Sequence, residues 1–267
     1  MAKLSKEHVV YIIVAAAVII AVASYLLISS SGCSLCGKPV SNSDLQQLQQ
    51  IANNNTLANQ VGIGIVQTTG KDSNIPKNVT GTPLIVNGKV EVLFVGGDFC
   101  PYCAVTRWSL VIALMRFGTF SNLTYMESSP TDSDPDTATL SFDNYSYSGT
   151  VGFNGFEVYD RSEIPVTPPG YTQFYQSVVN KYSSGGVPFI DFGNASVQSG
   201  AEISPAVLRG QDWDKVISNI RNPSSTDAQG IIGAANIFTA YICMSNSTLE
   251  SSAPACQQSY VKDIIGK

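Results

Sequence analysis

The sequence predicts an α/β fold, in which a central mixed sheet is flanked by helices, with an insertion and C-terminal helical additions, behind a single transmembrane helix. Three observations support this class. Residues 89–95 (Lys-Val-Glu-Val-Leu-Phe-Val) are apolar enough for a central strand. A glycine pair at 96–97 ends that strand, and an apolar helical segment runs from Cys100 to Gly118. Residues 9–28 form an uninterrupted run of twenty uncharged, mostly apolar residues.

The N-terminal run is long enough to cross a membrane. At about 1.5 Å per residue, residues 9–28 span roughly the 30 Å hydrocarbon core. An uncleaved anchor is favoured over a cleaved signal peptide, whose apolar region is usually only about 7–15 residues long. It is also favoured over acylation at Cys33, which lacks the usual apolar residue three positions earlier. Because Lys3 and Lys6 keep residues 1–8 in the cytoplasm, we expect a single-pass membrane protein whose C-terminal domain is extracytoplasmic.

The composition agrees with an extracytoplasmic domain that does not bind nucleic acid. Charged residues make up 13% of the chain, against about 25% in average proteins. Neutral polar residues fill the deficit, and we hypothesise that they suit an acidic exterior, where carboxylates become protonated. The net charge of −5 and the lack of basic clusters argue against contacts with nucleic-acid phosphates. Six glycosylation sequons predict a glycoprotein and begin at Asn54, Asn78, Asn122, Asn144, Asn194 and Asn246.

The histidine content excludes several kinds of catalytic site. The chain has one histidine, His8, which precedes the apolar run. The expected extracytoplasmic domain therefore has no imidazole. This excludes Ser-His and Cys-His nucleophilic catalysis and every zinc site that needs imidazole.

Turn residues and apolar periodicity divide the chain beyond the anchor into a stalk and one domain. Residues 29–60 form the stalk, which includes a short helix over 43–51. Residues 61–267 form the domain, with an insertion at approximately 128–182. The other expected elements are strands over 62–68, 83–87 and 123–127, a hairpin turn at Asn87-Gly88, an inserted hairpin of 139–147 and 152–159, a helix over 171–182, a hairpin through Gly193-Asn194, and helices over 205–220 and 226–244.

The segment Cys100-Pro101-Tyr102-Cys103 lies where the predicted central strand, a tight turn and the predicted helix meet. A cysteine at a helix start is close to free N–H groups and to the positive end of the helix dipole, which stabilise a thiolate. A lowered thiol pKa makes the sulfur reactive and a better leaving group. Cys100 is therefore the candidate nucleophile, and Cys103 the candidate resolving thiol. The alternatives are a structural disulfide and half of a metal site, but a strand before the motif and a buried helix after it are not typical of a zinc knuckle.

These segments resemble the thioredoxin superfamily. The resemblance rests on Val92–Val95, Phe99–Cys103 and Gly186–Asp191, and it covers roughly residues 83–220. It implies a thioredoxin-like fold, thiol–disulfide exchange, and polypeptide or small-thiol substrates. It also implies that Pro188, after Val187, is the cis-proline that faces the redox pair in this family and shapes a peptide-binding edge. The anchor, the paired cysteines and the low-charge exterior look like an uncharacterised family of membrane-anchored proteins from acidophilic archaea.

The chain departs from the family pattern around the redox pair. Members often carry a buried acid six residues before the first cysteine, where this chain has Phe94. Asp98 is the nearest acid, and it either assists proton transfer or is only a turn residue. Glutathione binding in glutaredoxins usually needs basic residues around the site. Arg107 alone does not support it, so no cofactor is expected.

The other four cysteines form two pairs along the sequence. Cys33-Ser34-Leu35-Cys36 is a local disulfide with a redox role, an inert disulfide, or half of an intermolecular metal site. Cys243 and Cys256 flank a Ser-rich loop, and we expect a structural disulfide between them, because the cysteine count is even and the domain extracytoplasmic.

The predicted function is thiol–disulfide exchange through Cys100 and Cys103 on protein or small thiol or disulfide substrates, with an electron partner that is not identified. Two other functions fit the same residues. One is a non-catalytic surface binding module with a thioredoxin fold, in which this pair is a staple. The other is a soft-metal-binding protein or metallochaperone that uses both Cys-x-x-Cys pairs as ligands.

Overall fold

The computed structural model describes residues 32–70 and 73–266. Leu35–Lys267 form one compact unit, and Met1–Ser34 form a separate one. The transmembrane segment predicted over residues 9–28 lies outside the described residues. In the part of the chain that is described, no helix combines the length and the apolar character needed to cross a bilayer.

The compact unit is an α/β fold with a mixed sheet and flanking helices. Its strands are β1 (Lys77–Asn78), β2 (Ile85–Val86), β3 (Lys89–Gly96), β4 (Gly118–Ser121), β5 (Thr124–Glu127), β6 (Ala138–Ser141), β7 (Ser146–Gly149), β8 (Gly152–Glu157), β9 (Phe189–Phe192) and β10 (Ser196–Ser199). Its α-helices are α2 (Asn42–Ala52), α3 (Asn55–Val61), α4 (Pro101–Met115), α5 (Gln173–Ser183), α6 (Trp213–Ile220), α7 (Gly233–Met244), α8 (Ser247–Ser252) and α9 (Ser259–Ile265). Two 3₁₀ turns, η1 (Pro205–Leu208) and η3 (Pro254–Gln257), and a π-helical turn, η2 (Ala228–Ile232), complete the unit.

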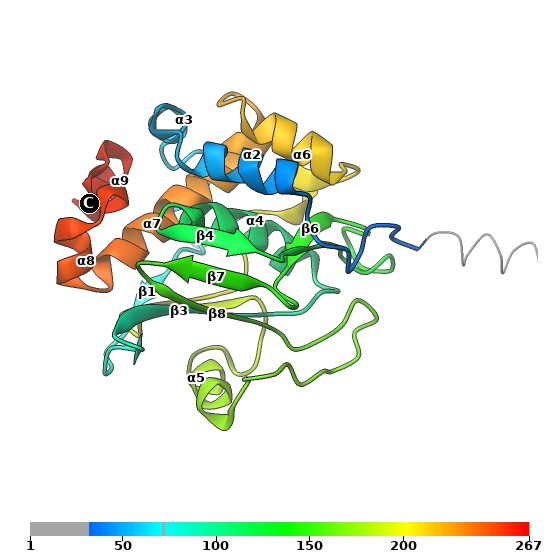
Figure 1. Cartoon of the computed structure of the whole chain (residues 1–267), viewed down its shortest axis with the longest axis horizontal. Helices are drawn as coiled ribbons and strands as arrows, with labels where there is room; N and C mark the ends of the chain where they lie inside the picture. The colour runs from blue at the N-terminus through cyan, green and yellow to red at the C-terminus, as the bar shows by residue number, and fades with distance from the viewer. Residues whose placement is uncertain (1–31, 71–72, 267) are drawn as a thin grey trace, which may run out of the picture. The chain divides into compact units, whose positions relative to one another are not determined.

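Strand β3 is the centre of the main sheet (Figure 1). It pairs in parallel with β8 and antiparallel with β9, and its first residues pair with β2. Strand β9 then pairs with β10, and β10 with β1. Every residue of β3 after Lys89 is buried, which confirms the prediction of a central strand over 89–95.

Two predicted hairpin turns are present. Asn87 and Gly88 both adopt positive φ angles, of 52° and 77°, between the antiparallel strands β2 and β3. A two-residue turn of this kind matches the twist of the strands that it joins. Gly193 and Asn194 also have positive φ angles between β9 and β10. Local turn chemistry was therefore sufficient to predict both hairpins.

Alternate residues of β3 face two unequal helical layers. Leu93 and Val95 pack in a core with Val179 of α5, the one buried residue of that helix. On the other face, Phe192 of β9 contacts Phe238 of α7, with ring centroids 5.6 Å apart. Figure 1 shows α5 on one side of the sheet and α4 with α7 on the other. Helix α4 is covered along its length, because all of its residues except Tyr102 are buried.

The segment expected as a stalk belongs to the compact unit from Leu35 onward. Helix α2 confirms the helix expected over 43–51, but it buries Leu48 and Ile51 and packs against α4. Helix α3, which was not expected, buries Leu57 and packs against α7. Apolar spacing predicts an amphipathic helix but does not say which surface covers its apolar face. The structure supplies that surface.

The segment expected as an insertion contains a strand of the main sheet. Strand β8 pairs in parallel with β3, whereas residues 139–147 were expected to pair with it in a hairpin. Instead, β6 pairs with β5 and β7 with β4, in two small two-stranded sheets. Residues 62–68, expected as a strand, form no strand: residues 62–65 are a turn, in which Gly62 and Gly64 take positive φ angles, and residues 66–68 are irregular.

The predicted disulfide between Cys243 and Cys256 is present. Their Cα atoms lie 5.7 Å apart, within the usual range of about 4.4–6.8 Å. Both cysteines are buried. The bond ties the end of α7 to η3 and so holds the C-terminal helical additions together.

Candidate functional site

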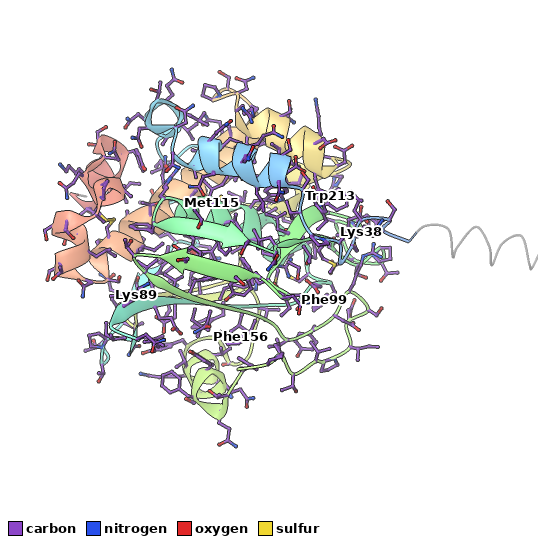
Figure 2. The ribbon with its side chains drawn as sticks, viewed as in Figure 1. Lys38, Lys89, Phe99, Met115, Phe156 and Trp213 are labelled. Carbon is purple, nitrogen blue, oxygen red and sulfur yellow. A yellow bond between two sulfur atoms is a disulfide. The ribbon has the colours of Figure 1, made fainter. Side chains whose placement is uncertain are left out.

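The predicted redox pair lies where β3 ends and α4 begins. Two glycines, Gly96 and Gly97, turn the chain out of the sheet, and a Cβ on Gly96 would lie 2.5 Å from the ring of Phe94. Cys100 is the N-cap of α4 and Pro101 its first residue, a position that costs no helical hydrogen bond. Figure 2 labels Phe99, next to Cys100, at the opposite end of the sheet from Lys89, where β3 starts.

The two thiols of this pair differ in their surroundings. Both are free, and Cys100 is 6% exposed while Cys103 is 0% exposed. The backbone N–H of Cys103 donates to the Cys100 sulfur over 3.2 Å. The pKa of Cys100 is lowered, first by the hydrogen bond with the Cys103 side chain and further by that N–H and by Arg107, although burial opposes the shift. Burial raises the pKa of Cys103 well above its usual value.

Pro188 lies at the same end of the sheet. Phe189 is the register partner of Val95, so Pro188 is opposite Gly96, where the chain leaves β3 toward Cys100. The Val187–Pro188 peptide bond is cis, as the resemblance implied. Pro188 is buried, and its carbonyl accepts a hydrogen bond of 2.8 Å from the N–H of Gly200.

A buried ion pair lies beneath the redox pair. Arg107 of α4, 0% exposed, donates to both carboxylate oxygens of Glu157 at the end of β8, over 2.9 and 2.6 Å. It also donates to the carbonyl of Gly97 over 2.8 Å. Burial disfavours the guanidinium, but the charge and hydrogen bonds of Glu157 outweigh it and raise the pKa of Arg107. This pair therefore fixes α4 to β8 directly behind the turn that carries the thiols.

Asp98 is the second acid of this network. Its Oδ1 lies 3.5 Å from Arg107 Nη2 and makes no hydrogen bond. Its backbone N–H donates to the carbonyl of Tyr159, which holds the turn against the end of β8. Burial, followed by the charge of Glu157, raises the pKa of Asp98 to about 8, although Arg107 opposes the shift. Asp98 is therefore a buried acid that can exchange a proton near neutral pH.

Asp98, Cys100, Cys103 and Pro188, the site residues predicted from the sequence, lie at one end of the sheet. Glu157 was not predicted. Arg107 could have indicated a buried acid, because it is an isolated charge in an apolar helix and a buried guanidinium needs a carboxylate partner. Glu157, at the end of an apolar strand, was the matching charge.

The remaining cysteines do not supply thiolates to this site. Cys33 and Cys36 are both disulfide-bonded, and Cys243 and Cys256 are bonded to each other. Within residues 32–70 and 73–266, the redox pair belongs to no group of three or more side chains spaced to hold a metal ion. The arrangement thus provides one thiol of lowered pKa, one buried thiol and one buried acid at the same end of the sheet.

Comparison with known proteins gave one family match. Residues 76–164 match the model of a domain of unknown function (DUF929). The matched part is about a third of the chain and contains both redox cysteines, Arg107 and Glu157, and it ends before Pro188. The comparisons with curated proteins and with solved structures gave no match.

Proposed function

We propose that this protein is a thioredoxin-like thiol–disulfide oxidoreductase in which Cys100 is the nucleophile and Cys103 the resolving thiol. The order of the central strands supports this assignment: a strand that leads into the cysteine pair, a parallel neighbour reached through α4, and an antiparallel neighbour that begins after a cis-proline. We also propose that residues 9–28 anchor the domain to a membrane, with the domain outside the cytoplasm.

The proposed reaction has two exchange steps. The Cys100 thiolate attacks one sulfur of a substrate disulfide, the substrate S–S bond breaks, and the second substrate sulfur leaves and takes up a proton. The Cys103 sulfur, after losing its proton, then attacks the Cys100 sulfur, which forms the Cys100–Cys103 disulfide and releases the first substrate thiol. The protein dithiol is oxidised by two electrons and the substrate disulfide is reduced to two thiols. Asp98, a buried acid whose pKa is raised to about 8, is the group proposed to take up the proton that Cys103 loses.

The contrast between the two thiols is the observation that carries the proposal. The hydrogen bond with the Cys103 side chain, at the start of α4, lowers the pKa of Cys100, and complete burial raises that of Cys103. A purely structural disulfide needs no such difference between the pKa values of its two thiols. A soft-metal function would also need thiolates from Cys33 and Cys36, which are disulfide-bonded and would have to be reduced before they bind a metal ion.

A trapping experiment tests the proposal. In the Cys103→Ser chain the second step is blocked, so a mixed disulfide between Cys100 and the substrate should accumulate and be released by dithiothreitol. The matched control is Cys100→Ser, in which the buried Cys103 should trap nothing. Equal trapping by both variants, or none by either under conditions in which free cysteine reacts, would remove the oxidoreductase assignment.

A further inference from the structure

An acidic cavity of about 270 Å³ adjoins the turn that carries Cys100. Four carboxyl side chains line it, and none of the described residues around it is a lysine or arginine. Its lining residues are Asp98, Asp143, Glu157, Asp160 and the segment Val166–Pro169. Asp98 follows β3 and Asp160 follows β8, and these two strands are parallel. Their carboxyl ends meet at one edge of the sheet, so the cavity opens at the edge that bears the redox pair.

The negative charge of this cavity is only partly compensated within the chain. Arg107 supplies the guanidinium beside the cavity. Its side chain is fully buried behind Glu157, and it binds that carboxylate through Nε and Nη2. Asp98 is 3% exposed, and its Oδ1 lies 3.5 Å from Arg107 Nη2 but accepts no hydrogen bond. Asp143 is exposed and Asp160 is half-buried, and neither has an ion-pair partner among the described residues. The cavity thus has four carboxyl groups beside one guanidinium, and the buried Asp98 Oδ1 accepts no hydrogen bond, so the cavity favours a positively charged ligand with N–H donors.

The spacing of the carboxyl groups points to an organic cation. In the described part of the chain, no three carboxyl oxygens of this cavity lie within 4.8 Å of one another, as ligands of one metal ion would. An ammonium or guanidinium group, by contrast, has several N–H donors that reach acceptors lying apart. The walls formed by Val166, Pro168 and Pro169 suit the aliphatic stem of such a group.

We propose that this cavity binds a positively charged group next to the reacting sulfur, so that the preferred substrates are cationic disulfides. The inference rests on the proposed exchange reaction at Cys100 and adds a substrate class to it. Asp143 and Asp160 attract the cation at the mouth of the cavity, and Asp98 lies further in. A lysine or arginine beside a substrate cysteine supplies the charge in a polypeptide, and an aminoalkyl group supplies it in a small disulfide.

The test measures charge preference at Cys100 without depending on turnover. The full-length Cys103→Ser chain is treated with two methanethiosulfonate reagents of equal chain length, one with an ammonium and one with a sulfonate head group. The rate of modification of Cys100 is measured for each by mass spectrometry and divided by the rate with 2-mercaptoethanol. We expect the normalised rate to be higher for the ammonium reagent, and the preference to weaken as salt is added.

Two charge variants locate the effect. Asp143→Asn should lower the cationic preference by about two- to fivefold, which is the effect of one unit charge a few ångströms away in a largely aqueous setting. The matched control is Asp263→Asn, which removes one exposed carboxylate from α9, on the far side of the unit from Phe99 in Figures 1 and 2. Equal normalised rates for the two reagents, or equal losses in the two variants, would overturn the inference.

Further measurements separate this inference from the proposed function. Reduction of the neutral bis(2-hydroxyethyl) disulfide by the wild-type chain tests the redox reaction alone, so turnover without charge preference refutes only the cavity assignment. Charge preference at Cys100 without turnover refutes the oxidoreductase assignment and leaves the cation site in place. Peptide disulfides with lysine or glutamate beside the cysteine identify the source: a lysine preference indicates a polypeptide substrate, and its absence, with the small reagents still discriminating, indicates a small cationic disulfide.

Discussion

Replacement of Arg107 by methionine should strongly destabilise the fold, because it leaves the carboxylate of Glu157 buried without its partner. Both side chains are almost fully buried, and they share two hydrogen bonds of 2.9 and 2.6 Å. Breaking such a pair from one side costs about 3–5 kcal/mol of unfolding free energy. Replacing both residues by methionine removes the uncompensated charge, so the double variant should lie within about 2 kcal/mol of the wild type.

The assay is urea unfolding followed by the fluorescence of Trp108 and Trp213, both of which are buried. The matched control is Arg209→Met. Arg209 pairs with Asp134, but 64% of its side chain is exposed, so this change should cost less than about 1 kcal/mol. Thiol alkylation against pH adds a second readout. Arg107 helps to lower the pKa of Cys100, and its removal should raise that pKa.

Two results would refute this reasoning. If Arg107→Met costs no more than Arg209→Met, burial does not strengthen the ion pair as assumed. If the double variant loses as much unfolding free energy as Arg107→Met and Glu157→Met lose together, the two residues act independently, and their hydrogen bonds do not represent a coupled interaction.

Three further predictions concern stability. The pKa of Asp98 is raised from 3.8 to about 8 in the folded chain. The stabilising contribution of its protonated carboxyl to the free energy of unfolding is therefore fully present below pH 3.8 and is lost as pH rises through 8. Asp98→Asn should flatten this fall in stability in a pH series of urea midpoints. Changing Cys243 and Cys256 to serine should cost about 2–3 kcal/mol in denaturant unfolding, and an unchanged midpoint would contradict the role given to this bond. Gly64→Ala would bring its Cβ to 1.8 Å from a backbone carbonyl of η2, so its melting temperature should fall well below that of Gly62→Ala, which has a similar φ angle but open space around it.

The parts of the fold that local chemistry determines were predictable. The central strand before Cys100, the helix after it and the turn at Asn87-Gly88 all depend on residues adjacent in sequence. Strand β8 was recognised as strand-like, but its partner was misassigned, because alternation of side chains does not specify which strand pairs with which. Only the parallel register of β8 with β3 brings Glu157 to the site.

The candidate site was predictable where one segment carries it and not where two segments meet. The Cys100–Cys103 motif and Pro188 each carry a local sequence signature. The acidic cavity has none, since Asp143, Glu157 and Asp160 come from separate turns and strand ends. Charged residues make up only 13% of this chain. A charge inside an apolar segment, such as Arg107, therefore indicates a buried partner of opposite charge.

The unequal covering of the two faces of the sheet has a consequence for the order in which the chain opens. Helix α5 buries only Val179, whereas α4 buries every residue except Tyr102. Elements with few buried contacts open locally at low free-energy cost, and densely covered ones open only when the whole domain unfolds. Amide hydrogen exchange should therefore be faster in α5 than in α4. Since α5 leads into the strand that starts after Pro188, the edge beside the thiols can loosen while the spacing of Cys100 and Cys103 stays fixed.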